Sequence, residues 1–352
     1  MHGFFSYPLN EVVLVINILI VAYSVMASII GAGFASGQEI LLYFVCFGRQ
    51  GIIGVVITAI IFTLLVFTVL YTCIKNQYKS YDEFLSIFKS TGIRIFIKFV
   101  TLLFSFAVYG AMLSATGELL FDFFGIPQAL GTLICAVGAI ALFRASGNGI
   151  FTLNGFLGII LVILITISAL YMLSYREFHA FSPSFLPPVN SAFIYSGYNL
   201  ISLIPVLVTL SQKLKTRSDA LSASFCVGGA SVIIMGLIFC LISIYAGKIN
   251  LGELPMITLA RRQNMIFATF YGFVLACAII TTLISSGGGL FNALMIRKKT
   301  LHISLITMLA YCLSSIGFSN IINTAYRLCG IFGIMVCAIT VFSALKKKTY
   351  YK

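Results

Sequence analysis

Residues 31–39 read Gly-Ala-Gly-Phe-Ala-Ser-Gly-Gln-Glu and stand between two apolar stretches, 12–30 and 40–47. Each glycine costs a helix about 1 kcal/mol relative to alanine, so this run weakens any helix that passes through it. Close packing of two helices in lipid would also explain the small residues. It would not explain Gln38 and Glu39, because an ionisable group inside a membrane is costly and usually functional. We therefore predict a helix that breaks near the middle of the membrane.

The composition around this run is that of an all-α integral membrane protein. Hydrophobic residues make up 60% of the 352 residues and charged residues only 9%, whereas about a quarter of a soluble domain is charged. A transmembrane helix needs about 20 mainly apolar residues, and Val12–Ile30, Gly51–Ile74 and Leu153–Leu173 all qualify. The segment before the first of them, Met1–Glu11, has no Lys or Arg, so we do not expect a cleavable signal peptide.

The apolar pattern predicts one transmembrane, transporter-like domain over residues 1–352. Its ten expected spans are 12–47, 51–74, 95–121, 127–143, 148–174, 190–212, 219–246, 264–294, 301–317 and 320–345. Residues 248–263 are expected to hold a short helix on the membrane surface. With the N-terminus in the cytoplasm, the inside connections carry roughly three times as many Lys and Arg as the outside ones. This predicts a multi-pass protein of the cell membrane with both termini cytoplasmic. The net charge of +13 is then mostly a signal for orientation, and nucleic-acid binding is not expected.

A second interruption lies in the sixth span, where residues 195–199 read Tyr-Ser-Gly-Tyr-Asn and Pro205 follows. Five spans form an odd-numbered repeat, so a second copy would be inverted relative to the first. The first repeat would cover 12–174 and the second 190–345. Breaks in spans one and six then occupy corresponding positions, which is the arrangement that marks a transporter binding site. We predict discontinuous helices in both spans, facing each other across a cavity.

The run at 31–39 resembles the signature of the YkvI-like family of small bacterial membrane proteins, and the Tyr198-Asn199 pair fits the same pattern. These proteins are similar to the amino acid–polyamine–organocation superfamily, which has the LeuT fold. The resemblance extends over nearly the whole chain. It implies a 5+5 inverted repeat, a site between spans one and six, and coupling to Na⁺ or H⁺.

The candidate substrate site follows from the two interruptions. A helix broken inside the membrane leaves free N–H groups, and these suit the anionic end of a solute. We expect the backbone of Gly31, Ala32 and Gly33, with Ser36, to bind that end. The facing wall would consist of Tyr195, Ser196, Tyr198 and Asn199. Tyr109 is either a cover for the site or an ordinary packed aromatic.

Two features bear on coupling. The superfamily resemblance implies a Na⁺ site formed by hydroxyl groups of the eighth span, where Thr281, Thr282, Ser285 and Ser286 lie. The alternative is that these hydroxyls bond back to carbonyls of their own helix. If the Na⁺ site is absent, Glu39 is the candidate proton carrier.

The remaining charged pair, Glu39 and Arg327, is expected at a similar depth on spans one and ten. An unpaired charge there is costly, so the two could form an ion pair that gates entry from outside. A static structural pair is one alternative. The other makes Glu39 the proton carrier, with Arg327 only tuning it.

Other chemistry is not indicated. The nine Cys stand singly, without a CxxC or Cys/His cluster, so we expect no metal site beyond Na⁺ and no cofactor. The chain lacks HExxH, GxSxG and P-loop motifs, which argues against an enzyme. The predicted function is secondary transport of a small solute, most simply amino-acid symport across the lipid bilayer. The alternative is a solute-sensing receptor subunit with a transporter fold, similar to germinant-receptor subunits.

Overall fold

The computed structural model describes residues 6–145, 149–174, 188–294 and 300–346. The elements that form the first half of the chain are α1 (Ser6–Ile29), α2 (Ala32–Ala35), α3 (Gln38–Tyr43), η1 (Val45–Gln50), α4 (Gly51–Asn76), α5 (Tyr81–Leu85), α6 (Thr91–Phe124), α7 (Gln128–Ala145) and α8 (Gly149–Ser174). Those of the second half are α9 (Val189–Ser211), α10 (Arg217–Tyr245), α11 (Pro255–Gln263), α12 (Met265–Ala293), α13 (Thr300–Ser314), α14 (Phe318–Ile321), η2 (Ile322–Tyr326) and α15 (Arg327–Lys346). Within these ranges every regular element is helical, and residues 248–263 contain the expected short helix, α11.

Among the described residues, six helices are long and apolar enough to cross a membrane. They are Val45–Asn76, Thr91–Phe124, Val189–Ser211, Arg217–Tyr245, Met265–Phe291 and Phe318–Ala344. The shorter apolar helices are Val13–Ile29, Gln128–Arg144, Ile160–Leu173 and Leu301–Ser314. Large apolar side chains on the outside of the bundle, such as Ile266 (85% exposed) and Phe124 (72% exposed), would be unfavourable in water and are suited to lipid. The prediction of an all-helical, multi-pass membrane protein is confirmed.

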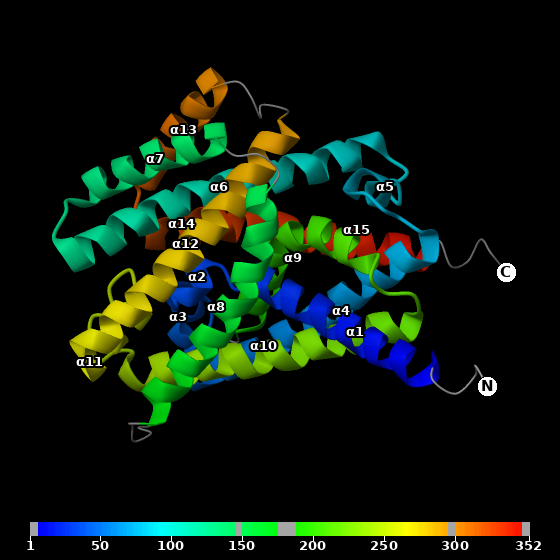
Figure 1. Cartoon of the computed structure of the whole chain (residues 1–352), viewed down its shortest axis with the longest axis horizontal. Coiled ribbons are helices and arrows are strands. Elements are labelled where there is room, and N and C mark those ends of the chain that lie inside the picture. The colour runs from blue at the N-terminus through cyan, green and yellow to red at the C-terminus, as the bar shows by residue number, and fades with distance from the viewer. Residues whose placement is uncertain (1–5, 146–148, 175–187, 295–299, 347–352) are drawn as a thin grey trace.

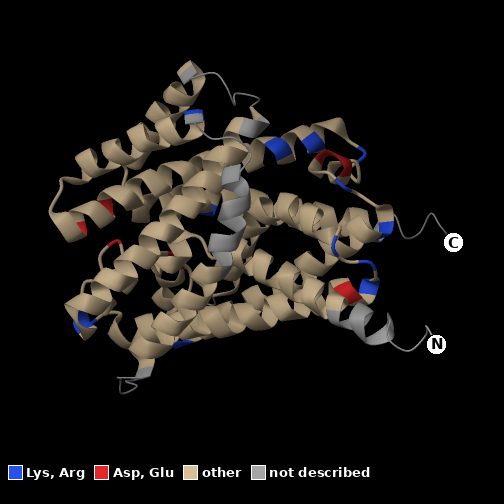
Figure 2. Cartoon of the chain, viewed as in Figure 1, with Lys and Arg blue, Asp and Glu red and all other residues tan. Residues whose placement is uncertain are grey.

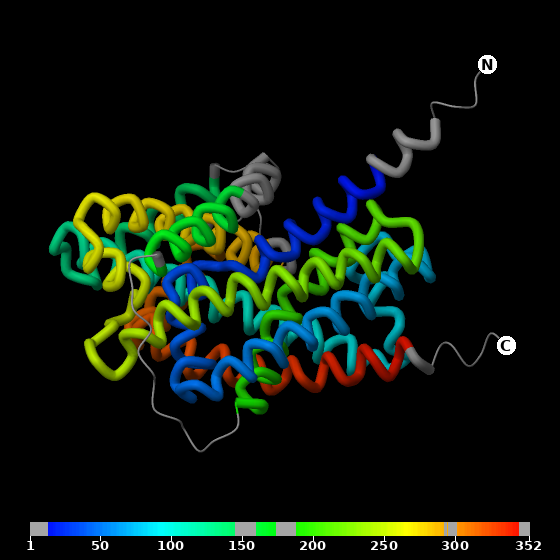
Figure 3. The backbone as a smooth tube through the Cα atoms, turned by 90° about the horizontal axis from the view of Figure 1, so that it is seen from below, coloured from blue at the N-terminus to red at the C-terminus, as the bar shows by residue number. Residues whose placement is uncertain are grey.

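The helices run mostly along the long axis of the molecule (Figure 1). α1 begins and α15 ends at one end of this axis, and the α9–α10 connection lies there too, whereas α11 lies at the other end. Figure 2 shows that Lys and Arg gather mainly at the end where α15 finishes. Seen from below, α10 runs alongside α4 over much of the length of the molecule (Figure 3).

The first span is interrupted within the glycine-rich run. α1 ends at Ile29, and Gly31 has an extended backbone (φ −83°, ψ −175°). After the four residues of α2, Gly37 adopts the left-handed conformation (φ 81°) that favours glycine. α3 then restarts the helix at Gln38, and the short helices α2 and α3 are both buried in the interior.

The expected interruption of the sixth span is wrong. α9 runs as a continuous helix from Val189 to Ser211, with Pro205 inside it. Gly197 serves helix packing instead: a β-carbon on it would lie 2.3 Å from the Gly330 carbonyl oxygen of α15. The polar Asn199 is satisfied within the helix, since its amide donates to the Tyr195 carbonyl at 3.0 Å. The small and polar residues at 195–199 therefore mark a close crossing of α9 with α15.

Candidate functional site around Glu39

Glu39, in the first turn of α3, is the buried carboxyl group at the centre of the candidate site. Only 6% of the residue is exposed. The hydroxyl of Tyr198 on α9 donates to its Oε2 at 3.0 Å. Its Oε1 lies over Gly33 on α2, where a β-carbon would be 2.2 Å away. The glycine of the interrupted span thus provides the space that the carboxyl group occupies.

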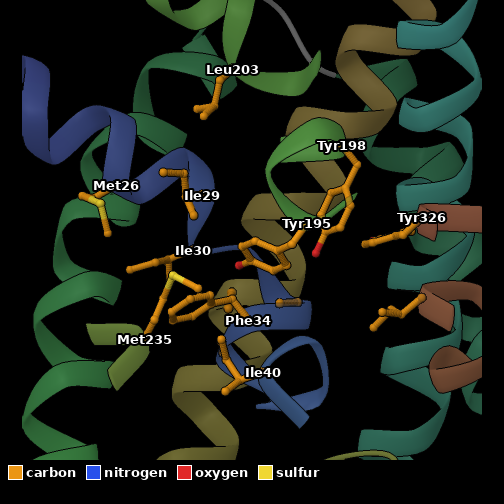
Figure 4. Close-up of a cluster of buried hydrophobic side chains, with 14 of the residues drawn as sticks. Met26, Ile29, Ile30, Phe34, Ile40, Tyr195, Tyr198, Leu203, Met235 and Tyr326 are labelled. Carbon is orange, nitrogen blue, oxygen red and sulfur yellow. The ribbon is translucent and has the colours of Figure 1, made fainter. Parts of the chain in front are cut away.

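Aromatic rings surround this carboxyl group, and we call Tyr43, Tyr195, Tyr198 and Tyr326 the tyrosine cluster. Ring centroids of Tyr43 lie 5.6 Å from those of both Tyr195 and Tyr198. Tyr195 and Tyr198 are 5.2 Å apart, and Tyr326 is 5.3 Å from Tyr198. Figure 4 shows Tyr195 and Tyr198 extending from α9 toward the part of the chain that carries Phe34 and Ile40, with Tyr326 beyond Tyr198.

The hydrogen-bonding capacity of this region is only partly used. The hydroxyl of Tyr195 is near the Glu39 carboxyl but has no hydrogen-bond partner among the described residues. The buried Ser196 hydroxyl and the Gln38 Oε1 atom are also without partners in that part of the chain. Gln38 does use its amide nitrogen, which donates to Ser319 at 2.5 Å. Buried polar groups are normally satisfied; of the exceptions among the described residues, these three lie in the α3–α9 region, and others, such as Thr58 and Ser168, lie elsewhere.

No Lys, Arg or His within the described ranges forms an ion pair with Glu39; the ion pairs there are Lys98–Asp82 and Arg261–Asp122. Arg327 is exposed. It lies near Tyr43, which is also within electrostatic range of Glu39. The Tyr43 hydroxyl itself donates to the Ile322 carbonyl in η2 at 3.2 Å. The structure therefore places Tyr43 close to both members of the expected pair, without a direct contact between Glu39 and Arg327.

Of the four hydroxyl groups proposed for the cation site, the Thr282 hydroxyl is the one that bonds to the backbone of α2. The Ala32 N–H donates to Thr282 Oγ1 at 3.2 Å. Thr282 also bonds back to the Ala278 carbonyl, as Thr281 does. Ser285 and Ser286 bond to the carbonyls of Thr281 and Thr282. All four hydroxyls thus follow the back-bonding alternative, and Thr282 additionally joins α12 to the interrupted span.

Several polar groups of α2 have local or structural partners. The Ser36 hydroxyl donates to the Gly33 carbonyl at 2.9 Å and accepts from the Gln38 N–H. The Ser36 carbonyl accepts from the Met256 N–H, which follows Pro255 at the start of α11. The Tyr271 hydroxyl of α12 donates to the Ala35 carbonyl at 2.6 Å. These bonds hold the short helix between α11 and α12, and Ser36 acts mainly as its terminating residue.

Tyr109 lies apart from the other candidate residues. Its hydroxyl is 3.0 Å from the hydroxyl of Thr307 on α13, and its ring packs against Phe143 and Phe291. The packed-aromatic alternative therefore describes Tyr109. From the same helix, α6, Phe104 reaches the site instead, with ring centroids 5.5 Å from Tyr198 and 5.2 Å from Tyr326.

Sequence reasoning missed Phe104, Tyr43 and Tyr326. Tyr43 follows Glu39 by four residues, and residues so spaced share a helix face. The sequence could therefore have predicted that Tyr43 lies near Glu39. Phe104 and Tyr326 lie in aromatic-rich spans. They reach the site through tertiary packing, which no local sequence pattern indicates.

No protein-family model matches the chain. The chain is 26% identical to the membrane protein YkvI of Bacillus subtilis over 321 residues, which are 88% of this chain and 91% of YkvI. It is 24% identical to the protein YyaD of the same organism over 331 residues, or 90% of this chain and 94% of YyaD. These relatives confirm the resemblance to the YkvI-like proteins.

Solved transporter structures are similar in fold. Mhp1 in its inward-facing conformation superimposes with a TM-score of 0.57 at 11% identity, covering 89% of this chain and 72% of Mhp1. A mutant of the Eremococcus coleocola manganese transporter gives 0.56 at 14% identity, covering 98% of this chain and 81% of the transporter. The chain is thus similar in sequence to the YkvI-like membrane proteins, and its fold is the LeuT fold of these transporters.

Proposed function

We propose that this protein is a secondary transporter that carries a small solute across the cell membrane by alternating access. The solute is an amino acid or related zwitterion, and its movement is coupled to Na⁺ or H⁺. The transporter fold supports this proposal. The observation that carries it is the position of Glu39, a buried carboxyl group held between the interrupted first span and α9. In the LeuT fold these are the elements between which a solute is expected to bind.

The proposed topology has ten spans in two inverted repeats within a single domain. The four shorter apolar helices, added to the six long ones, supply the required spans. The helix ends that share one side of the molecule with most Lys and Arg (Figure 2) would face the cytoplasm, by the positive-inside rule. Both termini are then cytoplasmic.

Two elements are available for coupling. Thr282 accepts a hydrogen bond from the Ala32 N–H at the break of span one and, like its neighbours, donates to a carbonyl of its own helix. Glu39 is buried without a cationic partner in the described ranges, so its ionised form is unfavourable there. A carboxyl group that ionises only when its surroundings change is suited to carrying a proton, and this arrangement favours H⁺ as the coupling ion.

Transport by the purified protein in liposomes tests this function. Labelled amino acids and amines are supplied outside, with a Na⁺ gradient, a pH gradient or neither. We expect accumulation of at least one solute to depend on the pH gradient, and Glu39→Gln to abolish that dependence. The exposed carboxyl of Glu83, at the start of α5, provides the matched control Glu83→Gln. Binding without uptake under every gradient would contradict the transporter function and identify a receptor.

A further inference from the structure

The charges around Glu39 specify which end of a solute this region can receive. We propose that the group bound at Glu39 is a protonated amine, and that the amine replaces a proton held by the same carboxyl. This inference rests on the proposed function and names the substrate class of that site. It differs from the expectation that the glycine-rich backbone binds the anionic end of a solute.

The hydrogen-bonding groups near Glu39 favour a donor. Among the described residues, the Tyr198 hydroxyl donates to Glu39 Oε2, and the Tyr195 hydroxyl lies near the same carboxyl group. Oε1 lies over Gly33, and the nearby Tyr195 hydroxyl has no partner within those ranges. The Ala32 N–H, which an anion would require, already donates to Thr282. An ammonium group has donors and no acceptor, so it complements these atoms, whereas a carboxylate would meet like charge whenever Glu39 is ionised.

The aromatic groups favour the same charge. Neighbouring rings of the tyrosine cluster and of Phe104 have their centroids 5.2–5.6 Å apart beside the carboxyl group. The face of an aromatic ring attracts cations. Since Glu39 is only 6% exposed, an amine reaches it when α3 separates from α9, as alternating access requires.

Among Glu39 and the titratable groups around it, Glu39 is the one whose charge is expected to change between about pH 5 and 8. Those near it or near its tyrosines are Tyr43, Tyr195, Tyr198, Tyr326, Cys329 and Arg327. Tyrosine is neutral and arginine is charged over about pH 5 to 8, and a cysteine thiol is mostly neutral there. Arg327 is exposed, acts on Tyr43 and forms no ion pair with Glu39. The negative charge on Glu39 is therefore balanced either by a bound proton or by a cation that the solute brings.

The exchange conserves charge and atoms. Protonated Glu39 and an ammonium ion give a carboxylate–ammonium pair and one proton, which passes to water when the site is open. The O–H bond of the carboxyl group breaks and no other bond changes. With an amine that carries no other charge, each form that becomes buried is neutral, so a proton and the amine use the site alternately and the transporter exchanges one for the other.

Proton release on binding tests this inference without transport. The purified protein in weakly buffered detergent is mixed with butylammonium, and a pH-sensitive dye records the protons released. Butanol and butyrate carry the same tail with a neutral or anionic head. We expect butylammonium alone to release about one proton per protein, and its affinity to rise about tenfold per pH unit from about pH 5 until Glu39 is ionised without ligand. Glu39→Gln should release none, while Glu83→Gln should behave as the wild type.

Butylammonium binding that releases no proton and has the same affinity over about pH 5 to 8 would overturn the inference, as would preferential binding of butyrate or no binding of butylammonium. If Glu39→Gln fails to fold, as judged by gel filtration, the wild-type pH dependence still decides. Tyr195→Phe removes an unpartnered hydroxyl and should weaken butylammonium binding severalfold, whereas Tyr311→Phe, far along α13, should not. Uptake of amino acids without amine-linked proton release would leave the transporter function standing and reject this inference. Proton release on butylammonium binding without any uptake in liposomes would support this inference and reject the transporter function.

Discussion

The Glu39 carboxyl lies so close over Gly33 that a β-carbon on this glycine would stand 2.2 Å from Oε1 and 3.0 Å from Cδ. A side chain at position 33 therefore forces the Glu39 side chain to shift, and we expect the shift to weaken its hydrogen bond with Tyr198. A hydrogen bond lost at a buried group costs about 1–3 kcal/mol. We expect Gly33→Ala to lower the rate of transport in liposomes by about ten- to a hundredfold. Gly229→Ala is the matched control, because its β-carbon meets nothing within 4 Å, and unchanged transport in Gly33→Ala would exclude this role for the glycine.

Thr282 and Thr281 provide a matched comparison on α12. Each donates to the Ala278 carbonyl, but Thr282 also accepts from the Ala32 N–H. Thr282→Val leaves that N–H unsatisfied and should lower the free energy of unfolding by about 1–3 kcal/mol. Thr281→Val should cost clearly less. Titration with a denaturing detergent measures both, and equal losses would contradict the contact between α2 and α12.

Tyr271 is expected to stabilise the short helix α2. Its buried hydroxyl donates to the Ala35 carbonyl at 2.6 Å, so Tyr271→Phe leaves a buried acceptor unpaired. The expected loss is about 1–3 kcal/mol of unfolding free energy. Tyr311→Phe, where the hydroxyl contact is 3.4 Å and exposed, should change stability by less than about 0.5 kcal/mol. A comparable loss in both variants would indicate a general effect of removing tyrosine hydroxyls.

Glu39 and Arg327 should differ in their importance, because the structure holds them apart. Glu39→Gln removes the ionisable group and should abolish pH-driven transport. Arg327→Gln should retain pH-driven transport, because Arg327 forms no ion pair with Glu39 within the described ranges and acts on the site through Tyr43. Uptake under a pH gradient measures both. Loss of transport in both single variants, with recovery in the charge-swapped double variant, would instead establish the ion-pair gate.

The proposed topology predicts opposite labelling of two exposed positions. Asn250 precedes α11 and Ser218 lies in the first turn of α10. In a variant without native cysteines, Asn250→Cys should react with an impermeant maleimide in intact cells. Ser218→Cys should react only after the membrane is opened. The reverse labelling pattern would indicate that the protein is inserted in the opposite orientation. Equal labelling of both cysteines in intact cells would contradict the ten-span arrangement.

Composition and apolar runs predicted the helical, multi-span class, because runs of about 20 apolar residues match the length of a transmembrane helix. The interruption of span one was also visible, since the glycine-rich run includes Gly37, whose left-handed backbone favours glycine. Gly197 misled the prediction for span six. A glycine that breaks a helix and one that admits a neighbouring helix look alike in sequence, and only the position of Gly330 separates them.

The candidate site was predictable only in part. Glu39 stood out because a carboxyl group is conspicuous in an apolar span, and Tyr195 and Tyr198 followed from the polar run on α9. Tyr109 and Phe104 show where sequence reasoning fails. Both lie on α6, five positions apart, but the Phe104 ring packs against Tyr198 and Tyr326, whereas the Tyr109 ring packs against Phe143 and Phe291. Which face of α6 meets α9 depends on how the whole bundle packs.

The tyrosine cluster also gives this protein an optical property. The chain has 17 tyrosines and no tryptophan, so its near-ultraviolet emission comes from phenol rings alone. A neighbouring carboxylate quenches phenol fluorescence more strongly than a carboxylic acid does, and Glu39 has several phenols around it. Emission from the unlabelled protein should therefore report the protonation of Glu39, and stopped-flow recordings of the native chain could follow its proton steps in real time.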